Sequence, residues 1–525
     1  MRRIAIVGGG IAGLTAAYEL ARLARNGAPV EAILFESSNR LGGLIETVRE
    51  GGFTVEAGPD GWVSAKPWAR ELAVELGIAD ELIPSNDATR RTHIFLTTSE
   101  NPSGRLVPMP DGLNLMVPTN LAALDHSPLF TQAAIAAYRA EPARAAELLA
   151  AIPAHDESVA DFTLRHFGPE VLARVAAPLL SGVFGGDVRN LSVRAVMPVF
   201  VQMERTHGSL IAALQRTTNN QQPATPIFTT LRSGLGTLID RLVAAIPPQW
   251  LRLNTTVTAI EPSSNLTPHS SQLADKTDSP PWTVLTSTTG KHRGSDTFDA
   301  VLLATPLDAT RRLLTPLDIT AAQLLPTESN SAVLVAFAYP DATRFPLPPG
   351  FGFLVPPTQV EKASSRPDSE PGAPHLDSEM WVSTNPSLLL ACTFADQKFP
   401  HRVPPGGRLV RAFFGGLAAD RIARCNNDEI AAIARLELAR ILNSTMPISA
   451  AAPTPAPVPA LTVVRRWPNS LPQYAVGHPA RVAELETRLR ALPGLTVLGN
   501  ALHGVGLPDL IRDARQAARS VATGN

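Results

Sequence analysis

The sequence predicts an α/β protein: a nucleotide-binding parallel sheet opens the chain, a mixed sheet follows, and a helical subdomain is inserted between them. Apolar runs at residues 4–7 and 32–35 flank a helical pattern at 12–23, which is the strand–helix–strand unit of a parallel sheet. Ala/Leu/Arg-rich segments with helical spacing occupy 129–149 and 170–180. Strand-like runs that predict the second sheet return at 332–338, 351–355, 388–393 and 409–414.

The composition limits the class of protein. A chain of 525 residues, 44% hydrophobic, is long enough for two or three domains with buried cores. Forty-six basic and 47 acidic side chains leave a net charge of −1, which gives no electrostatic basis for binding nucleic acid. Cys392 and Cys425 have no metal-ligand spacing with each other or with histidine, so we expect no metal site.

The N-terminus and the hydropathy predict a cytoplasmic location. Met1 leads into a strand-like run without the apolar core of a secretory signal. No stretch approaches the roughly 18 uninterrupted apolar residues of a membrane-spanning helix. Residues 113–138 are apolar enough to rest on a bilayer surface, although Pro118 and Pro128 prevent one spanning helix. Peripheral membrane contact therefore stays open. Four proline-rich stretches are predicted as surface loops: 217–226, 263–281, 356–377 and 450–460.

A phosphate-binding motif follows the first strand and opens the first helix. It is the G-x-G-x-x-G run Gly8-Gly9-Gly10-Ile11-Ala12-Gly13. Gly8 permits the tight turn, Gly10 lets the backbone approach a pyrophosphate, and Gly13 permits close packing of the helix on the strand. The amides at the helix start then bind the phosphates.

A carboxylate completes the dinucleotide site. The second strand ends at Glu36, 23 residues beyond Gly13, where it can accept both hydroxyls of an adenosine ribose. Next comes Ser37-Ser38-Asn39-Arg40-Leu41-Gly42-Gly43, with an arginine and two glycines where a flavoprotein chain crosses the pyrophosphate again. This Glu, Arg, Gly-Gly run resembles the flavin-containing amine oxidase superfamily. The resemblance implies FAD, and the lack of a cysteine after Cys425 predicts that it is bound non-covalently.

Further segments resemble the same superfamily. Residues 53–59 resemble the strand and turn near the isoalloxazine ring, and Val257 lies in the segment similar to the strand that pairs with adenine. Residues 495–522 again indicate strand, Gly-rich turn and helix, and Pro508 suits the first helical turn. The helix's positive end would face the flavin N1 and C2 carbonyl. The other cofactor-binding residues that we expect from the resemblance are Leu44, Gly58, Pro59, Asp60, Gly61, Trp467, Gly499, Asn500, Val505, Gly506 and Leu507.

Four segments are similar to one branch, the oxygen-dependent protoporphyrinogen oxidase and coproporphyrinogen III oxidase family. They are residues 58–62, 204–210, 471–478 and 504–509. The resemblance spans nearly the whole chain and departs at Gly61 and Trp62, where the family commonly has Ser-Phe. It implies an apolar slot beside the flavin with polar anchors at its rim. Candidate lining residues are Val333, Phe351, Phe353 and Leu354; Asp60 would meet a pyrrole N–H and Lys66 a propionate.

The resemblance implies an oxidase that removes six hydrogens from a porphyrinogen in three two-electron rounds. Each round passes a hydride to flavin N5 and then to oxygen, giving hydrogen peroxide, and no side-chain acid or base is assigned. Protoporphyrinogen IX is slightly favoured as the substrate. Coproporphyrinogen III is the alternative, because a lysine after the Gly-Pro-Asp turn, here Lys66, resembles the arrangement in the coproporphyrinogen-oxidising members. A flavin amine oxidase is a more distant alternative, since the strand after Leu325 lacks the lysine that such enzymes use. A non-catalytic flavin-fold binding protein like the prenyl-GTPase dissociation inhibitors fits the intact phosphate loop poorly.

Three domains follow from the resemblance. A Rossmann-like FAD-binding domain comprises 1–86, 226–312 and 465–525; a mixed-sheet substrate-binding domain comprises 87–95, 210–225 and 313–464; the helical subdomain is 96–209. The expected partners are the porphyrinogen, oxygen and, for hand-over of the product, the next enzyme of heme synthesis. The sequence does not predict the oligomeric state.

Overall fold

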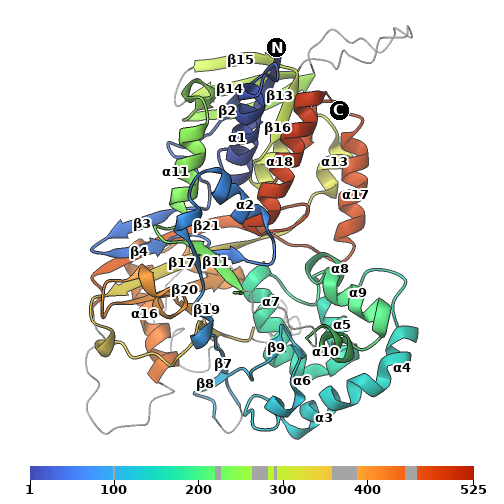
Figure 1. Ribbon diagram of the computed structural model, residues 1–525, viewed down its shortest axis with the longest axis vertical. Helices are drawn as coiled ribbons and strands as arrows, with labels where there is room; N and C mark the ends of the chain where they lie inside the picture. Colours follow the sequence, from blue (N-terminus) through green and yellow to red (C-terminus); the bar gives the residue numbers. More distant parts are fainter. Residues whose placement is uncertain are drawn as a thin grey trace, which may run out of the picture.

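The computed structural model describes residues 1–98, 101–218, 226–262, 282–288, 292–357, 387–443 and 458–524. Figure 1 shows the parallel sheet and its helices at the top, where both termini lie, with a large mixed sheet and a helical subdomain below. The predicted loop 263–281 lies outside the described residues. Most of the predicted loops 217–226, 356–377 and 450–460 also lie outside them.

The predicted strand–helix–strand unit forms the centre of a five-stranded parallel sheet. Its strand order is β12 (Leu251–Arg252), β2 (Val30–Phe35), β1 (Arg2–Val7), β16 (Ala300–Leu303) and β22 (Leu495–Val497). Successive side chains of a strand point to opposite faces. Ile4 and Ile6 accordingly face one core, and Ala5 and Val7 face the other.

Different elements pack on the two faces of this sheet. On the first lie α1 (Ile11–Arg25), α11 (Gly236–Ala245) and α18 (Leu507–Thr523), with α1 beside α18 in Figure 1. The second is covered by the antiparallel strands β13 (Thr255–Pro262), β14 (Trp282–Thr288) and β15 (His292–Phe298), with α12 (Leu307–Leu314), α13 (Ile319–Leu324) and α17 (His478–Leu489). Because both faces are buried, the central strands are continuously apolar, and their sequence therefore predicts them well.

The four predicted later strands belong to one seven-stranded mixed sheet. Its order is β21 (Leu461–Pro472), β17 (Ser329–Tyr339), β20 (Arg408–Gly415), β19 (Leu389–Phe394), β18 (Gly352–Leu354), β7 (Thr92–Leu96) and β8 (Arg105–Pro108). All neighbours are antiparallel except β18 and β7. One face packs against α15 (Gly416–Ile422) and α16 (Asn427–Asn443). The opposite face packs against the hairpin β3 (Thr47–Glu50) and β4 (Phe53–Glu56) of the cofactor domain.

The helical subdomain has a separate core, and several of its helices begin with side-chain caps. Its helices are α3 (Gln132–Ala140), α4 (Ala145–Ala150), α5 (Val159–Phe167), α6 (Pro169–Val171), α7 (Ala177–Phe184), α8 (Val193–Val196), α9 (Pro198–His207) and α10 (Leu210–Thr218). The Ser158 hydroxyl accepts from the Asp161 amide at 3.0 Å, a cap that is worth about 1 kcal/mol. Apolar side chains of 113–138, including Val117 and Tyr138, are buried in this core.

Three elements fall across the predicted domain boundaries. β8 pairs with β7 in the large sheet, although the sequence predicts a helical subdomain over 96–209. β21 pairs with β17, although the prediction assigns 465–525 to the cofactor domain. Leu210 and Ile211 of α10 pack in the helical core and not in the substrate domain. Strand pairing and helix packing join segments that are distant in sequence, so neither local patterns nor a resemblance places such boundaries to within one element. The rest of the division stays a prediction.

Candidate functional site

The glycine motif forms the predicted turn between β1 and α1, and its glycines differ in what an added side chain would meet. A Cβ on Gly8 would lie 2.3 Å from the Ala304 carbonyl oxygen, and one on Gly13 only 1.9 Å from that of Gly8. Glycine at position 8 therefore permits the close approach of the segment after β16, and glycine at position 13 permits that of α1 to the end of β1. A Cβ on Gly10 would meet nothing within 4 Å, so the backbone there is open to a ligand. Ile11 and Ala12 begin the helix and are buried.

Glu36 lies at the end of β2, directly beside this turn. One carboxylate oxygen accepts from the Gly9 amide at 2.8 Å and the other from the Ser38 amide at 2.8 Å. The Ser37 hydroxyl donates to the carboxylate at 3.3 Å. Charge-assisted bonds of this kind fix a carboxylate's orientation. The structure therefore brings Glu36 and the glycine turn together, as the sequence predicts.

The second glycine pair, Gly42 and Gly43, packs directly on the first glycine turn. Both adopt positive φ, at 108° and 58°, a conformation that favours glycine. The Gly42 amide donates to the Gly9 carbonyl at 2.8 Å, and Gly10 and Gly42 form a short parallel bridge. A Cβ on Gly43 would approach the Gly10 Cα to 3.1 Å. These contacts leave the open side of Gly10 as the place where a pyrophosphate can lie.

Arg40 holds the loop that carries this glycine pair. Its guanidinium donates to the carbonyl of Gly43 and, at 3.0 Å, to that of Ile45. The side chain is 40% exposed and lies 3.8 Å from the Glu46 carboxylate. Arg40 therefore fixes the shape of the loop, and its contact with a phosphate stays a proposal. Leu44, between the two bonded carbonyls, is exposed.

The turn after β4 continues from these loops toward the large sheet. A Cβ on Gly58 would lie 1.9 Å from the Leu44 carbonyl oxygen, so this turn touches the second glycine loop. The Trp467 indole N–H donates to the Ala57 carbonyl at 2.9 Å and ties the turn to β21. Pro59 follows Gly58, and a Cβ on Gly61 would lie 2.6 Å from the Thr229 carbonyl oxygen. The turn is thus held between the cofactor loops and the large sheet.

Asp60 does not offer a free carboxylate at this turn. Its oxygens lie 3.1 Å from the Lys398 ammonium and 3.0 Å from the Arg411 guanidinium. Burial opposes ionisation, but Lys398, Arg411 and Arg402 outweigh it and hold the pKa of Asp60 well below its usual range. The expected hydrogen bond from a pyrrole N–H must therefore compete with two cations. The local sequence could not show this, since Lys398 lies 338 residues away.

The C-terminal turn lies close to the first glycine turn: a Cβ on Gly499 would lie 3.9 Å from the Thr305 carbonyl oxygen, and one on Gly8 would lie 3.3 Å from the Thr305 amide nitrogen. Gly499 adopts φ 129°, and the Asn500 side chain donates to the Ser470 carbonyl at 2.8 Å. The Tyr474 hydroxyl donates to the Asn500 carbonyl at 2.6 Å and accepts from the Gly504 amide at 3.0 Å. These bonds hold the turn in front of α18. Its remaining predicted residues are Val505, which packs against the helical core, Gly506, the N-cap of α18, and Leu507, the first helical residue.

Lys66 reaches the start of α18. Its ammonium lies 2.6 Å from the Asp509 carboxylate; the Asp509 side chain is only 4% exposed, whereas that of Lys66 is 46% exposed. A carboxylate in the first turn of a helix is favoured by the helix dipole. Lys66 is thus an ion-pair partner within the protein, and its contact with a substrate propionate stays a proposal.

Two of the four expected slot residues face away from the cofactor domain. Val333 and Phe353 are each 1% exposed and pack in the core on the α16 side of the large sheet. The sequence identifies their strands correctly but not their faces, because neighbouring residues of a strand alternate between faces. Phe351 is buried beside its strand. Leu354 packs against the helical core, where its side chain would lie 3.2 Å from a Cβ on Gly182 of α7.

Val257 lies in β13 with its side chain in the core of the parallel sheet. The ladder with β14 shifts register between Val257 and Ala259. Thr255, two residues earlier, donates its amide to the Glu36 carbonyl at 2.9 Å, so this strand starts beside the predicted ribose carboxylate. The adenine contact of Val257 stays a proposal, supported by this placement.

Sequence reasoning missed Glu56, Lys398, Arg402 and Arg411, four buried ionisable residues around Asp60. One signal was available for Arg411, a charged residue inside the apolar run at 409–414. Lysine and arginine are almost never fully buried unless they are paired. A cation within a buried strand therefore indicates a buried carboxylate partner, although not which one.

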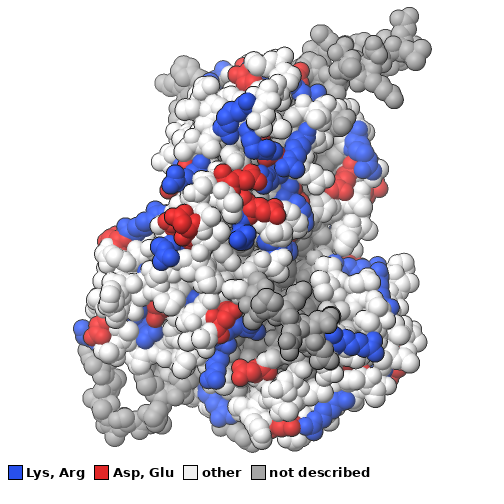
Figure 2. Space-filling model, in the orientation of Figure 1, with Lys and Arg blue, Asp and Glu red and all other residues white. Residues whose placement is uncertain are grey.

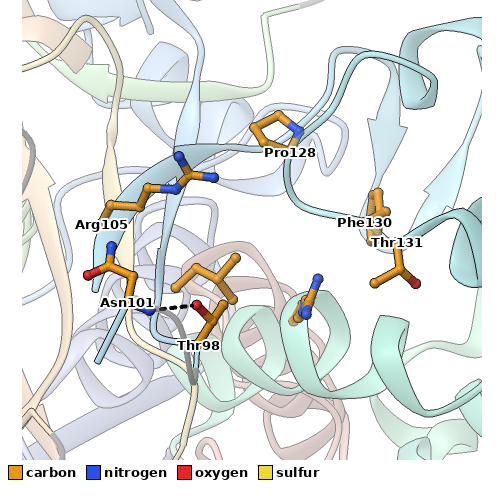
Figure 3. A pocket seen from close by; sticks show the side chains of 8 residues that line it. Thr98, Asn101, Arg105, Pro128, Phe130 and Thr131 are labelled. Carbon is orange, nitrogen blue, oxygen red and sulfur yellow. Dashed lines mark hydrogen bonds between the residues drawn. The ribbon is translucent and has the colours of Figure 1, made fainter. Parts of the chain in front are cut away.

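A separate cavity of about 400 Å³ lies between the β7–β8 hairpin and the helical subdomain. Figure 3 shows Thr98, Asn101 and Arg105 on one side and Pro128, Phe130 and Thr131 on the other. None of its lining residues belongs to the glycine turns, so it is distinct from the predicted cofactor site. On the face drawn in Figure 2, basic and acidic side chains are interspersed.

The residues of the site fit a dinucleotide. Gly10 leaves a cradle that a larger side chain would begin to fill, and Glu36 stands at the end of the neighbouring strand, where an adenosine ribose would lie. Both α1 and α18 begin after a glycine N-cap, Gly10 and Gly506, which has no side chain to cap the first-turn amides. The first-turn amides of α1 can therefore meet a ligand. In α18, Pro508 has no N–H and the Asp509 amide donates to the Gly506 carbonyl at 3.0 Å, which leaves the Leu507 amide for a ligand. In the part of the chain that the structure describes, no helix has the length and apolar composition needed to cross a membrane.

This fold and site define the class of protein: the chain belongs to the family of flavin-containing amine oxidoreductases, whose model matches residues 11–522. The predicted flavin cofactor and oxidoreductase class are thereby confirmed. Over 99% of its length the chain is 28% identical to the coproporphyrinogen III oxidase of Bacillus subtilis (strain 168) and covers 98% of it. It is 27% identical to the chloroplastic protoporphyrinogen oxidase 1 of Spinacia oleracea, over 98% of this chain and 83% of that one.

A solved structure agrees with these relatives. A protein from Exiguobacterium sp. 255-15, named as a candidate protoporphyrinogen oxidase, matches with a TM-score of 0.76 and 26% identity. The match covers 100% of this chain and 99% of that one. The predicted α/β fold and the resemblance to the porphyrinogen oxidases are both confirmed.

Proposed function

We propose that this protein oxidises a porphyrinogen to a porphyrin in heme biosynthesis, with non-covalent FAD and with oxygen as the final oxidant. The observation that carries the proposal is similarity over nearly the full chain to proteins named for this reaction. Bound flavin would supply hydride acceptance and return of electrons to oxygen, giving hydrogen peroxide over three two-electron rounds. The protein's own residues bind and orient the reactants.

The proposal gives each cofactor-binding residue a role. The amides of the Gly8–Gly13 turn would hold the pyrophosphate, and Glu36 the ribose hydroxyls. The positive end of α18, with Gly506 as its N-cap, would face the pyrimidine part of the flavin ring. Trp467 holds the Gly58 turn in position through the Ala57 carbonyl.

The substrate would lie where the three parts of the molecule meet. Leu354 of the large sheet approaches Gly182 of α7 there and gives an apolar surface. The Asn330 amide donates to the Gln473 side-chain oxygen at 3.0 Å, and this oxygen also approaches Gly186, just after α7. The side chains of Asn330 and Gln473 therefore lie near the contact between the large sheet and α7. A slot with an apolar wall and few polar anchors suits a tetrapyrrole.

Of the two porphyrinogens, coproporphyrinogen III is supported by the names of bacterial relatives such as that of Bacillus subtilis. Protoporphyrinogen IX, slightly favoured from the sequence, is supported by the name of the Spinacia oleracea relative. Coproporphyrinogen has four propionates instead of two and needs more positive charge at the rim. Because several bacterial relatives are named for coproporphyrinogen III, we propose that both are oxidised and that coproporphyrinogen has the higher kcat/KM.

The test is turnover of both porphyrinogens by the purified yellow protein, followed by porphyrin fluorescence and peroxide release. The proposal expects porphyrin formation from both and no turnover of putrescine or cyclohexylamine as a control for amine oxidation. A flavin-loaded protein that turns over neither porphyrinogen would contradict it. Peripheral membrane contact, a cytoplasmic location and hand-over to the next enzyme belong to the same proposal; co-sedimentation with anionic vesicles tests the first.

A further inference from the structure

A group of five ionisable side chains lies directly behind the Gly58–Gly61 turn; four of them are buried and the fifth, Asp60, is partly buried. We name this group the Asp60 cluster. Its members are Glu56, Asp60, Lys398, Arg402 and Arg411. Glu56 and Arg402 are each 1% exposed, Arg411 is 3% exposed and Lys398 is 8% exposed. The cluster joins two domains, because its carboxylates come from the cofactor domain and its three cations from the domain of the large sheet.

The cluster carries one more positive than negative charge. Asp60 contacts Lys398 and Arg411, and Glu56 pairs with Arg402 at 2.6 Å, which leaves three cations against two carboxylates. The Nε atoms of Arg402 and Arg411 are buried without a hydrogen-bond partner among the described residues. A buried excess charge is costly unless something compensates for it. An anionic neighbour outside the protein would provide that compensation.

The turn connects this charge to the cofactor site. Arg411 donates to the Gly58 carbonyl, and Gly58 packs on the Leu44 carbonyl of the second glycine loop. Arg402 donates to the Asp60 carbonyl at 3.2 Å. The charged groups are therefore bonded to the backbone that lies between the cluster and the cofactor loops. Inside a protein such charges act more strongly than in water.

Lys398 is the member whose charge can be changed with least damage. Its ammonium lies 4.2 Å from the ring centre of Phe228 and 5.1 Å from that of Phe399, so a methionine has apolar contacts ready. Asp60 would keep Arg411 as a partner. Burial lowers the pKa of Lys398, but the adjacent Asp60 carboxylate favours its charged form. Lys398 is also one of only five lysines in the chain.

We propose that Lys398 is a positioning residue that keeps the Asp60 cluster net positive and thereby favours negative charge on the flavin bound against the Gly58–Gly61 turn. The inference rests on flavin binding and not on the choice of substrate. It predicts that any reaction that places negative charge on the ring, such as reduction or addition of an anion, depends on the charge of the cluster. Lys398 acts through the turn and not by contact with the reacting atoms.

Sulfite is a probe that needs no porphyrinogen. The sulfur lone pair of SO3²⁻ forms a bond to N5 of oxidised flavin, and no group leaves. One negative charge stays on the resulting sulfonate and the other moves onto the ring, which bleaches the visible flavin absorbance. Lys398→Met should weaken sulfite binding about tenfold, the change that about 1.4 kcal/mol produces. Lys398→Arg, which keeps the charge, should retain the wild-type Kd, and Asp60→Asn should tighten binding.

Opposite effects of Lys398→Met and Asp60→Asn separate a charge effect from structural damage, which would weaken binding in both. The midpoint potential of the bound flavin, measured against reference dyes, should fall in Lys398→Met and stay unchanged in Lys398→Arg. Arg139→Met removes an exposed cation paired with Asp125 at 2.6 Å and serves as the control. If Asp60→Asn does not fold, the comparison of Lys398→Met with Lys398→Arg tests the proposal without it. An unchanged potential and sulfite Kd in flavin-loaded Lys398→Met would overturn the proposal, whether or not the protein oxidises porphyrinogens.

Discussion

Replacing Gly10 by alanine tests whether the glycine turn holds the cofactor phosphates. Gly10 has φ −74° and ψ −178°, a conformation that alanine adopts without strain, and the added Cβ would meet nothing within 4 Å. The apoprotein should therefore keep its stability to within about 0.5 kcal/mol, as at other tolerant surface sites. Only a ligand lying on the turn would meet the new methyl group.

The expected loss is one amide–phosphate contact. A hydrogen bond to a charged group contributes about 2 kcal/mol, so FAD affinity should fall about 30-fold. Titration of the apoprotein with FAD, followed by flavin fluorescence quenching, measures this directly. Gly13→Ala is the matched comparison, because its Cβ would lie 1.9 Å from the Gly8 carbonyl oxygen in the protein itself. The free energy of unfolding of that variant should fall by about 1–3 kcal/mol, and its affinity for FAD should fall as well.

The two variants must differ for the reasoning to hold. Gly10→Ala should unfold in urea at the wild-type midpoint as apoprotein, whereas Gly13→Ala should unfold earlier. The assignment of the open cradle to the pyrophosphate would be refuted if Gly10→Ala bound FAD with an affinity within about twofold of wild type. One lost charged hydrogen bond should produce a much larger change.

Three other outcomes are expected. Heat or acid should release FAD from the polypeptide, and flavin that co-migrates with the denatured chain would show a covalent bond instead. Lys66→Ala should lower kcat/KM for coproporphyrinogen more than for protoporphyrinogen in the fluorescence assay. The loss should be less than about tenfold, because a rim ion pair contributes about 1 kcal/mol or less. Equal losses for both substrates would mean that Lys66 pairs with Asp509 and does not bind a propionate. Burial lowers the pKa of His166, but its bonds to Glu141 and Glu204, both at 3.0 Å, outweigh burial and raise it. Protonated His166 therefore stabilises the folded protein. This contribution is fully present below pH 6.5 and is lost as the pH rises through the raised pKa of His166. The urea midpoint of the wild type should fall over that pH range, whereas the midpoint of His166→Gln should not.

Local patterns in the sequence predict the glycine turns and the carboxylate of the proposed cofactor site. Gly8, Gly10 and Gly13 are identified by their spacing, and the structure places them in the predicted turn because a turn between strand and helix depends on backbone sterics over a few residues. The central strands of the parallel sheet are equally predictable, since a strand buried on both faces is apolar throughout. Glu36 follows at the strand end, where a parallel sheet presents its ligands.

Tertiary structure decided the surroundings of the residues that the sequence predicts for the substrate. Val333 and Phe353 lie in correctly predicted strands but face α16, because a strand's period of two makes the buried face a matter of pairing and not of composition. Lys66 pairs with Asp509, and Asp60 with Lys398, across separations of 443 and 338 residues. Partner choice for a charge depends on which elements pack together, and only the packed chain specifies that.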